Sequence, residues 1–98
     1  MKRYEWNEEK NRKLRIEREI SFEDIIEALK QGKLIDRYKH PNEEQYPQQE
    51  IMVVEIGDYA YLVPFVEDEG RIFLKTIYKS RKATKKYIKY KRGKHNGN

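Results

Sequence analysis

The sequence contains no cysteine, so neither a disulfide nor a thiolate metal site can form within this chain. Histidine is almost absent, and the five glycines lack the spacing of a phosphate-binding loop. No apolar run is long enough to span a bilayer, and no apolar signal-peptide core follows the charged N-terminus. We therefore expect a cytoplasmic protein with no metal, no cofactor and no membrane partner.

The length of 98 residues suits one compact domain and is too short for two ordinary ones. Charged residues make up 40% of the chain and hydrophobic residues 37%, but the hydrophobic residues are clustered, which favours a folded domain over disorder. We expect one domain over residues 1–92 and a flexible basic tail over residues 93–98.

Charge is distributed unevenly along the chain. Residues 1–70 hold all seventeen acids and eleven basic residues, whereas residues 71–98 hold eleven basic residues and no acid, which gives net charges of −6 and +11. An anionic partner at the C-terminal end is favoured, and nucleic acid is the commonest one because Lys and Arg neutralise its phosphates. A solvated basic end that only aids solubility is the alternative.

Two helices are predicted before residue 32. Asn7 is a plausible N-cap for the first, with acidic residues in the first turn that follows. The second begins at a capping-box-like pair, Ser21 and Asp24, and its apolar residues recur at helical spacing. Gly32 is placed to end it. A short extended piece at residues 34–35 and a polar loop over residues 39–49 follow.

Three strands are predicted next, at residues 50–56, 59–66 and 71–78. Because only "GD" and "EDEG" separate them, they should form an antiparallel meander. Pro64 indicates an edge, a bulge or a strand end. Strict alternation in the third strand would place Leu74 on one face and Ile77 on the other.

The basic end of the chain is predicted to be a helix first and a tail second. Ser80 can cap it, and Ala83, Tyr87 and Tyr90 fall on one face, so that its lysines form a cationic outer surface. The expected fold is therefore α+β, with two N-terminal helices, a three- to four-stranded antiparallel sheet and a basic C-terminal helix.

A concentration of basic and tyrosine residues around the third strand and the last helix is where chemistry is expected. Cleavage of RNA through its own 2′-hydroxyl needs a base, an acid and positive groups for the crowded phosphorus, and it needs no metal. A binding surface without catalysis uses the same residue types, and the tyrosines serve either sheet packing or base stacking. His40, in the polar loop, is an exposed loop residue or a general acid or base.

The order of three motifs, "YEWNEEKN", "SFEDIIEAL" and "GRIFLKTIYKSRKATKKY", resembles the BrnT family of type II toxin–antitoxin toxins. The resemblance implies a fold similar to the RelE ribonuclease toxins, and a toxin that cuts RNA and inhibits translation. It also implies a cognate DNA-binding antitoxin as partner and higher-order toxin–antitoxin assembly. By motif it points to Arg81, Lys82 and Thr84, and more loosely to Lys10. Arg18 occupies the position where many members carry a histidine.

We therefore expect a metal-independent endoribonuclease with RNA as substrate. The catalytic candidates are Arg81, Lys82, Arg18 and Tyr87. The RNA- and phosphate-binding candidates are Arg71, Lys75, Thr84, Lys85, Lys86 and Lys89. A non-catalytic nucleic-acid-binding module that uses the basic C-terminal helix is the alternative function, and a domain whose basic end docks on an acidic protein partner is a third.

Overall fold

The computed structural model describes residues 2–89. In it, both N-terminal helices begin at the capping side chains that the sequence predicts. The Asn7 side chain accepts a hydrogen bond from the Lys10 amide at the start of α1 (Glu8–Arg18). Ser21 and Asp24 form a complete capping box at the start of α2 (Phe22–Lys30). Gly32, at φ +75°, lies in the left-handed region beyond that helix, as expected.

Asn11 fixes the corner between the two helices, although it is a polar residue with no exposed surface. Its Oδ1 accepts a hydrogen bond of 2.8 Å from the Phe22 amide, and its Nδ2 donates to Glu23 at 2.8 Å. The same bond lowers the pKa of Glu23. Because both polar atoms of the buried amide are satisfied, its burial carries little penalty and α2 is held at a fixed angle to α1.

A sheet of six strands forms the centre of the described structure, in the order β1-β5-β4-β3-β2, with β6 also paired to β4. The strands are β1 (Arg3–Glu5), β2 (Leu34–Lys39), β3 (Gln49–Ile56), β4 (Tyr59–Asp68), β5 (Arg71–Leu74) and β6 (Tyr78–Lys79). The antiparallel meander β3-β4-β5 is confirmed. The expected strand number was too low, because β2 extends one edge and β1 pairs with β5 at the other, in parallel.

The third predicted strand is interrupted, and Pro64 explains where. Leu74 is the last residue of β5 and pairs with Phe65, so Lys75 comes to lie opposite Pro64. The Lys75 amide donates to the Pro64 carbonyl at 2.8 Å, but proline has no N–H to return the second bond of that pair. The chain leaves the sheet there and rejoins it at β6, so Ile77 packs in the same core as Leu74 and the predicted alternation is wrong.

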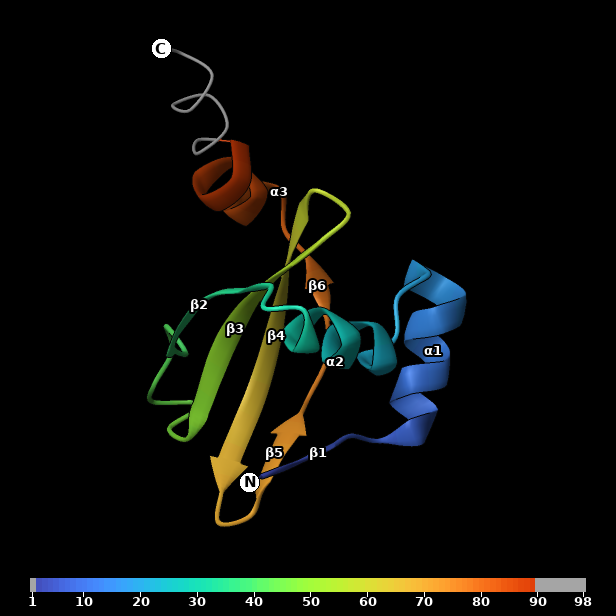
Figure 1. The fold of residues 1–98 in the computed structure, drawn as a ribbon. Coiled ribbons are helices and arrows are strands. Elements are labelled where there is room, and N and C mark those ends of the chain that lie inside the picture. The colour runs from blue at the N-terminus through green and yellow to red at the C-terminus, as the bar shows by residue number, and fades with distance from the viewer. Residues whose placement is uncertain (1, 90–98) are drawn as a thin grey trace.

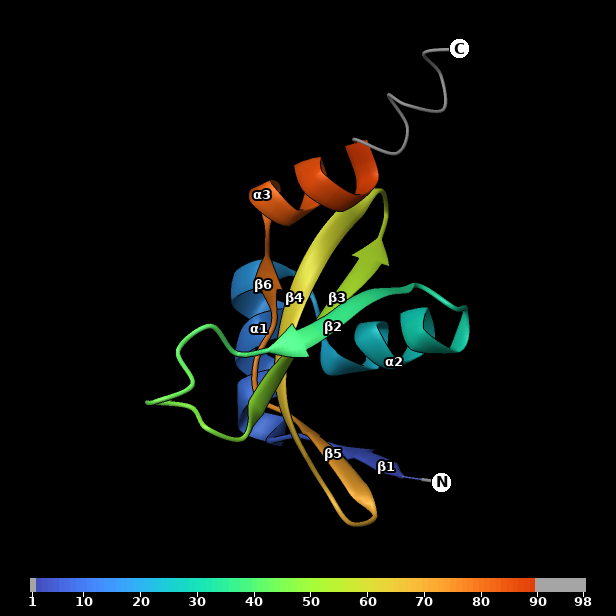
Figure 2. The same ribbon diagram turned by 90° about the vertical axis from the view of Figure 1, so that its left-hand side faces the viewer.

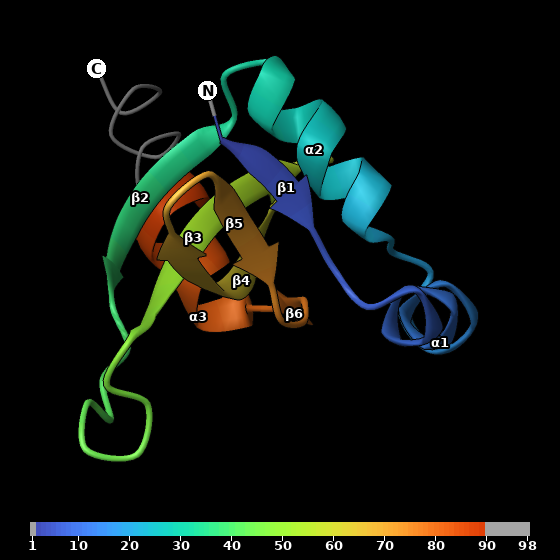
Figure 3. The same ribbon diagram turned by 90° about the horizontal axis from the view of Figure 1, so that it is seen from below.

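The two faces of the sheet bury different clusters. On one, here called the α1/α2 face, Met52, Val54, Val63 and Phe65 pack against the two N-terminal helices. On the other, the α3 face, Val53 and Ala60 pack against the C-terminal helix. Figure 1 shows α1 and α2 beside the sheet and the C-terminal helix across the end where β3 turns into β4. The view from below in Figure 3 shows the strand order, and Figure 2 shows the loop between β2 and β3 projecting from the body.

The predicted C-terminal helix is present, with a change of pitch. Ser80 is its N-cap, as expected, and its side chain accepts a hydrogen bond from the Ala83 amide at 3.0 Å. The helix begins as α3 (Arg81–Ala83) and continues as the wider π-helix η1 (Thr84–Lys89). Tyr90, His95 and the expected tail at 93–98 lie outside the described residues.

Candidate functional site

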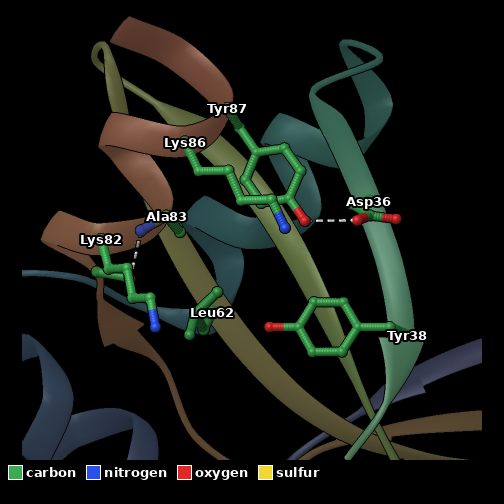
Figure 4. A pocket seen from close by; sticks show the side chains of 8 residues that line it. Asp36, Tyr38, Leu62, Lys82, Ala83, Lys86 and Tyr87 are labelled. Carbon is green, nitrogen blue, oxygen red and sulfur yellow. Dashed lines mark hydrogen bonds between the residues drawn. The ribbon is translucent and has the colours of Figure 1, made fainter. Parts of the chain in front are cut away.

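A cleft of about 440 Å³ opens on the α3 face between the C-terminal helix and β2 (Figure 4). Three strand residues form its floor and one wall, and five residues from the cap and helix form the other. The lining residues are Asp36, Tyr38, Leu62, Ser80, Lys82, Ala83, Lys86 and Tyr87. The cleft therefore joins three segments that lie far apart in the sequence.

A hydrogen bond between Tyr87 and Asp36 closes one end of the cleft. The Tyr87 hydroxyl donates to Asp36 Oδ2 at 2.6 Å (Figure 4). This bond lowers the pKa of Asp36, with further lowering from the Arg37 amide and the Lys86 charge, and it raises the pKa of Tyr87. At neutral pH the site therefore holds an ionised carboxylate beside a protonated phenol.

Two lysines of the helix reach into the cleft. Lys82 extends toward the floor near Leu62, and Lys86 runs alongside Tyr87, with its ammonium 4.9 Å from the ring centroid (Figure 4). Neither forms an ion pair with a carboxylate in the part of the chain that the structure describes. Both side chains are exposed to an anionic ligand, although the charge of Lys86 also acts on Asp36.

Tyr38 forms the wall opposite Lys82. It extends from β2 over the floor, half-buried, and packs with Leu62 in the smaller core cluster (Figure 4). Burial is the main cause that raises its pKa, with the nearby Tyr87 and Asp36 adding to the effect. Its hydroxyl therefore stays protonated at neutral pH and is available as a hydrogen-bond donor.

Some of the predicted site residues meet at this cleft. Lys82, Lys86 and Tyr87 line it directly. Lys85 shares an adjoining shallow surface with the same three residues. Arg81 and Lys89 are exposed on the same helix and do not line the cleft. The helix thus presents a cationic outer surface over its whole described length.

Thr84 faces the protein interior. Its side chain is 1% exposed, accepts a hydrogen bond from the Ala60 amide at 2.8 Å, and donates one to the Ser80 carbonyl at 2.7 Å. The hydroxyl is thereby committed to holding the helix on the end of β4. In this arrangement Thr84 does not reach the surface on which a phosphate would lie, contrary to the binding role expected from its motif.

Arg18 lies apart from the cleft lining, at the edge of the sheet. Its Nη1 donates to the Ile77 carbonyl at 2.7 Å, and its guanidinium lies 5.3 Å from the centroid of the Tyr78 ring. The carbonyl belongs to the interrupted segment between β5 and β6. Arg18 therefore satisfies a backbone group that the break leaves outside the strand ladder.

Arg71 is the first residue of β5, and Lys75 directly follows its last residue. Arg71 pairs with Glu5 at 3.1 Å and with Asp68 at 3.6 Å, and the Glu5 bond is the main cause of its raised pKa. Lys75 is exposed and lies 5.5 Å from the Phe73 ring centroid. Arg71 is thus already neutralised, whereas Lys75 remains open and shares a second hollow with Lys10.

The sequence profile of a family described as Domain of unknown function (DUF4258) matches residues 11–79. The chain belongs to this family. No curated protein and no solved structure matches the chain. Within residues 2–89 no helix is long and apolar enough to cross a membrane, and no three His, Cys, Asp or Glu side chains group as a metal site would require.

The DUF4258 segment contains the residues of the cleft that sequence reasoning missed. Asp36, Tyr38 and Leu62 come from β2 and β4 and lie inside the matched range, whereas the helix wall lies beyond it. Alternation in 34–39 was the one available signal, since it places Asp36 and Tyr38 on the same face of a strand. Nothing local indicates that this face meets the C-terminal helix.

Proposed function

We propose that this DUF4258 protein is the toxin of a type II toxin–antitoxin pair and cleaves RNA without a metal. The observation that carries the proposal is the cleft in which Lys82 and Lys86 lie beside the protonated Tyr87 and Tyr38, with Asp36 as the single carboxylate of the lining. Phosphate groups are the natural ligands of ammonium groups that outnumber the nearby acids.

The groups at the cleft fit the needs of this reaction. Attack of a ribose 2′-oxygen on the adjacent phosphorus forms one O–P bond and breaks the bond to the 5′-oxygen, leaving a cyclic phosphate and a 5′-hydroxyl. Tyr87 retains a proton that it can give to the leaving oxygen, and Asp36 is an ionised acceptor. Lys82 and Lys86 face the charge that develops on the phosphoryl oxygens.

The motif order that resembles the BrnT family supports the same proposal, as does an α+β fold with two N-terminal helices and a basic C-terminal helix. On this basis we propose a RelE-like fold for the chain. The partner proposed is an antitoxin with an acidic segment that covers the cationic helix, since an acidic chain and RNA would compete for the same lysines.

A non-catalytic nucleic-acid-binding module is the second candidate, and one observation favours it. The pKa of Asp36 is lowered, and the pKa values of Tyr38 and Tyr87 are raised, so all three move farther from pH 7. Proton transfer is fastest for groups whose pKa lies near the working pH. Under this alternative the cleft binds phosphates and leaves the RNA intact.

The test is RNA integrity. The purified chain, freed of any partner, is incubated with mixed RNA in EDTA at low salt, beside the Lys82→Ala and Lys30→Ala variants. Lys30 is the matched control, an exposed lysine on α2. We expect cleavage by the parent and by Lys30→Ala, and cleavage about 100-fold slower for Lys82→Ala.

Three results separate the alternatives. Fragments that end in cyclic phosphate support the ribonuclease. Binding that Lys82→Ala weakens, with RNA intact after long incubation, supports the binding module. An RNA that is neither bound nor cut contradicts both. Arg81→Ala, run alongside, asks whether a helix residue outside the cleft lining also contributes, as the motif resemblance implies.

A further inference from the structure

Tyr78 is an aromatic side chain left open beside the floor of the cleft. It is 49% exposed, although tyrosines on a sheet usually bury most of the ring. Tyr78 pairs with Leu62 across β6 and β4, so both side chains project from the α3 face. The ring therefore lies next to the cleft that Lys82 and Tyr38 enclose.

Arg18 fixes the position of this ring. Its hydrogen bond to the Ile77 carbonyl, at 2.7 Å, holds the guanidinium within 5.3 Å of the Tyr78 ring centroid. A planar guanidinium stacked on an aromatic ring restricts the ring and leaves the charge in place beside it. Arg18 thus connects the end of α1 to a single exposed tyrosine 60 residues later in the chain.

A second aromatic side chain continues the row. Phe73 lies on the same face, because it pairs with Val66 while Tyr78 pairs with Leu62, and Lys75 lies 5.5 Å from its ring. Four residues of β4 separate the two pairing positions, which corresponds to about 13 Å along the strand. The row therefore runs from Lys82 past Tyr78 to Lys75 and Phe73.

Cations outnumber acids along this row: Glu9 shares the hollow of Lys75 and Phe73 with two further lysines, Lys10 and Lys13, and the acids at the two ends are engaged. Asp36, at the cleft end, accepts the hydrogen bond from Tyr87, and Asp68, at the far end, pairs with Arg71. Between them, Lys82 and Lys75, which form no ion pair within the described part of the chain, alternate with the rings of Tyr78 and Phe73. Here Tyr78 is exposed and Phe73 is half-buried. Cations beside accessible aromatic rings are a means by which proteins hold single-stranded nucleic acid, because the rings stack with bases while the cations contact phosphates.

We infer that the ligand of this face is single-stranded RNA, with one base stacked on Tyr78. Arg18 acts as a positioning residue for that ring, in place of the catalytic role expected from the sequence. The inference rests on the proposed function and adds to it the strandedness of the substrate. Paired bases in a duplex have no free face to offer Tyr78, so duplex RNA would contact only the lysines.

The experiment compares two fluorescent probes: a single-stranded oligonucleotide of about ten 2′-O-methyl nucleotides, which a 2′-hydroxyl mechanism cannot cut, and its duplex. Tyr78→Leu keeps the apolar bulk and removes the ring, Tyr78→Phe keeps the ring, and Tyr4→Leu is the matched control. Tyr4 is also exposed, but it pairs with Ile72 and so lies on the α1/α2 face.

We expect Tyr78→Leu to bind the single strand about 10-fold more weakly, and Tyr78→Phe and Tyr4→Leu to bind it like the parent. Duplex binding should be unchanged by all three. Arg18→Ala should weaken single-strand binding less than Tyr78→Leu and should add little when combined with it, because both act through one ring. Crosslinking of a single strand carrying a photoreactive uridine should label the peptide that contains Tyr78.

Equal binding of the single strand by Tyr78→Leu and the parent would overturn the inference while leaving the proposed function intact. The same holds if Tyr78→Leu weakens both probes equally. Should the parent bind neither probe and cleave no RNA, the proposed function falls and the inference falls with it. Circular dichroism of every variant establishes that the fold is retained.

Discussion

The α1/α2 face of the sheet and the cleft on its α3 face carry charged residues in different ways. On the α1/α2 face, Arg37 bonds to Glu50 at 2.9 Å and also to Glu67, which in turn pairs with Lys2 at 2.7 Å. These bonds, that to Glu50 first, raise the pKa of Arg37, while Lys2 and then Arg37 lower the pKa of Glu67. In the cleft, Lys82 and Lys86 form no ion pair among residues 2–89, and Lys86 acts on Asp36 through its charge alone.

This contrast separates a structural use of charge from a binding use. Matched charges across neighbouring strands join β2, β3 and β4 and leave little field for a ligand. Unmatched ammonium groups next to aromatic rings stabilise the fold little and leave a strong positive field. Substitution of the paired charges should therefore lower stability, whereas substitution of the cleft lysines should weaken RNA binding. Four changes test this.

Charge reversal in the cleft should have the largest effect. The Lys82→Glu/Lys86→Glu double variant is expected to bind RNA at least about 100-fold more weakly, because two phosphate contacts become repulsive. Its melting temperature should remain near that of the parent, since both side chains are exposed. Fluorescence anisotropy measures the binding. Undiminished RNA binding would show that the cleft is not the interface.

Removal of the Thr84 hydroxyl should have the largest effect on stability. Thr84→Val keeps the shape but leaves the Ala60 amide without its 2.8 Å partner, which should cost about 1–3 kcal/mol in the free energy of unfolding. Urea denaturation measures this, and Thr84→Ser, which keeps the hydroxyl, is the control. A Thr84→Val protein as stable as the parent would mean that the helix is held by packing alone.

Loss of Arg37 should have a smaller effect, confined to stability. Arg37→Ala is expected to lower the free energy of unfolding by no more than about 1 kcal/mol, because the ion pairs are exposed enough for solvent to screen them. The difference from the parent should shrink in about 1 M salt. RNA binding should be unchanged, and a marked loss of it would contradict the division between the faces.

The smallest effect should be a pH dependence from the Tyr87–Asp36 bond. The bond lowers the pKa of Asp36 in the fold, so its contribution to stability is present above the ordinary Asp pKa of about 3.9 and is lost as pH falls through the lowered value. Tyr87→Phe should remove this part of the acid sensitivity. Melting temperatures at neutral pH and at about pH 3 measure it, with Tyr46→Phe, in the exposed loop, as control.

Local structure was predictable from the sequence alone. The caps at Asn7, Ser21 and Ser80 each depend on hydrogen bonds within three residues, so the sequence itself determines where the helices begin. Short connections determined the β3-β4-β5 meander in the same way. The cationic character of the last helix also follows from composition, whatever the helix packs against.

The tertiary structure decided what these elements do together. Pro64 ends β5 only because Lys75 lies opposite it, and Thr84 is buried only because its helix crosses the end of β4. The Tyr87–Asp36 bond joins residues 51 apart, and the Arg18–Ile77 bond joins residues 59 apart. Such contacts depend on strand order and on the angle of each helix, which no local sequence pattern encodes. The residues that form the site could therefore be identified only from the tertiary structure.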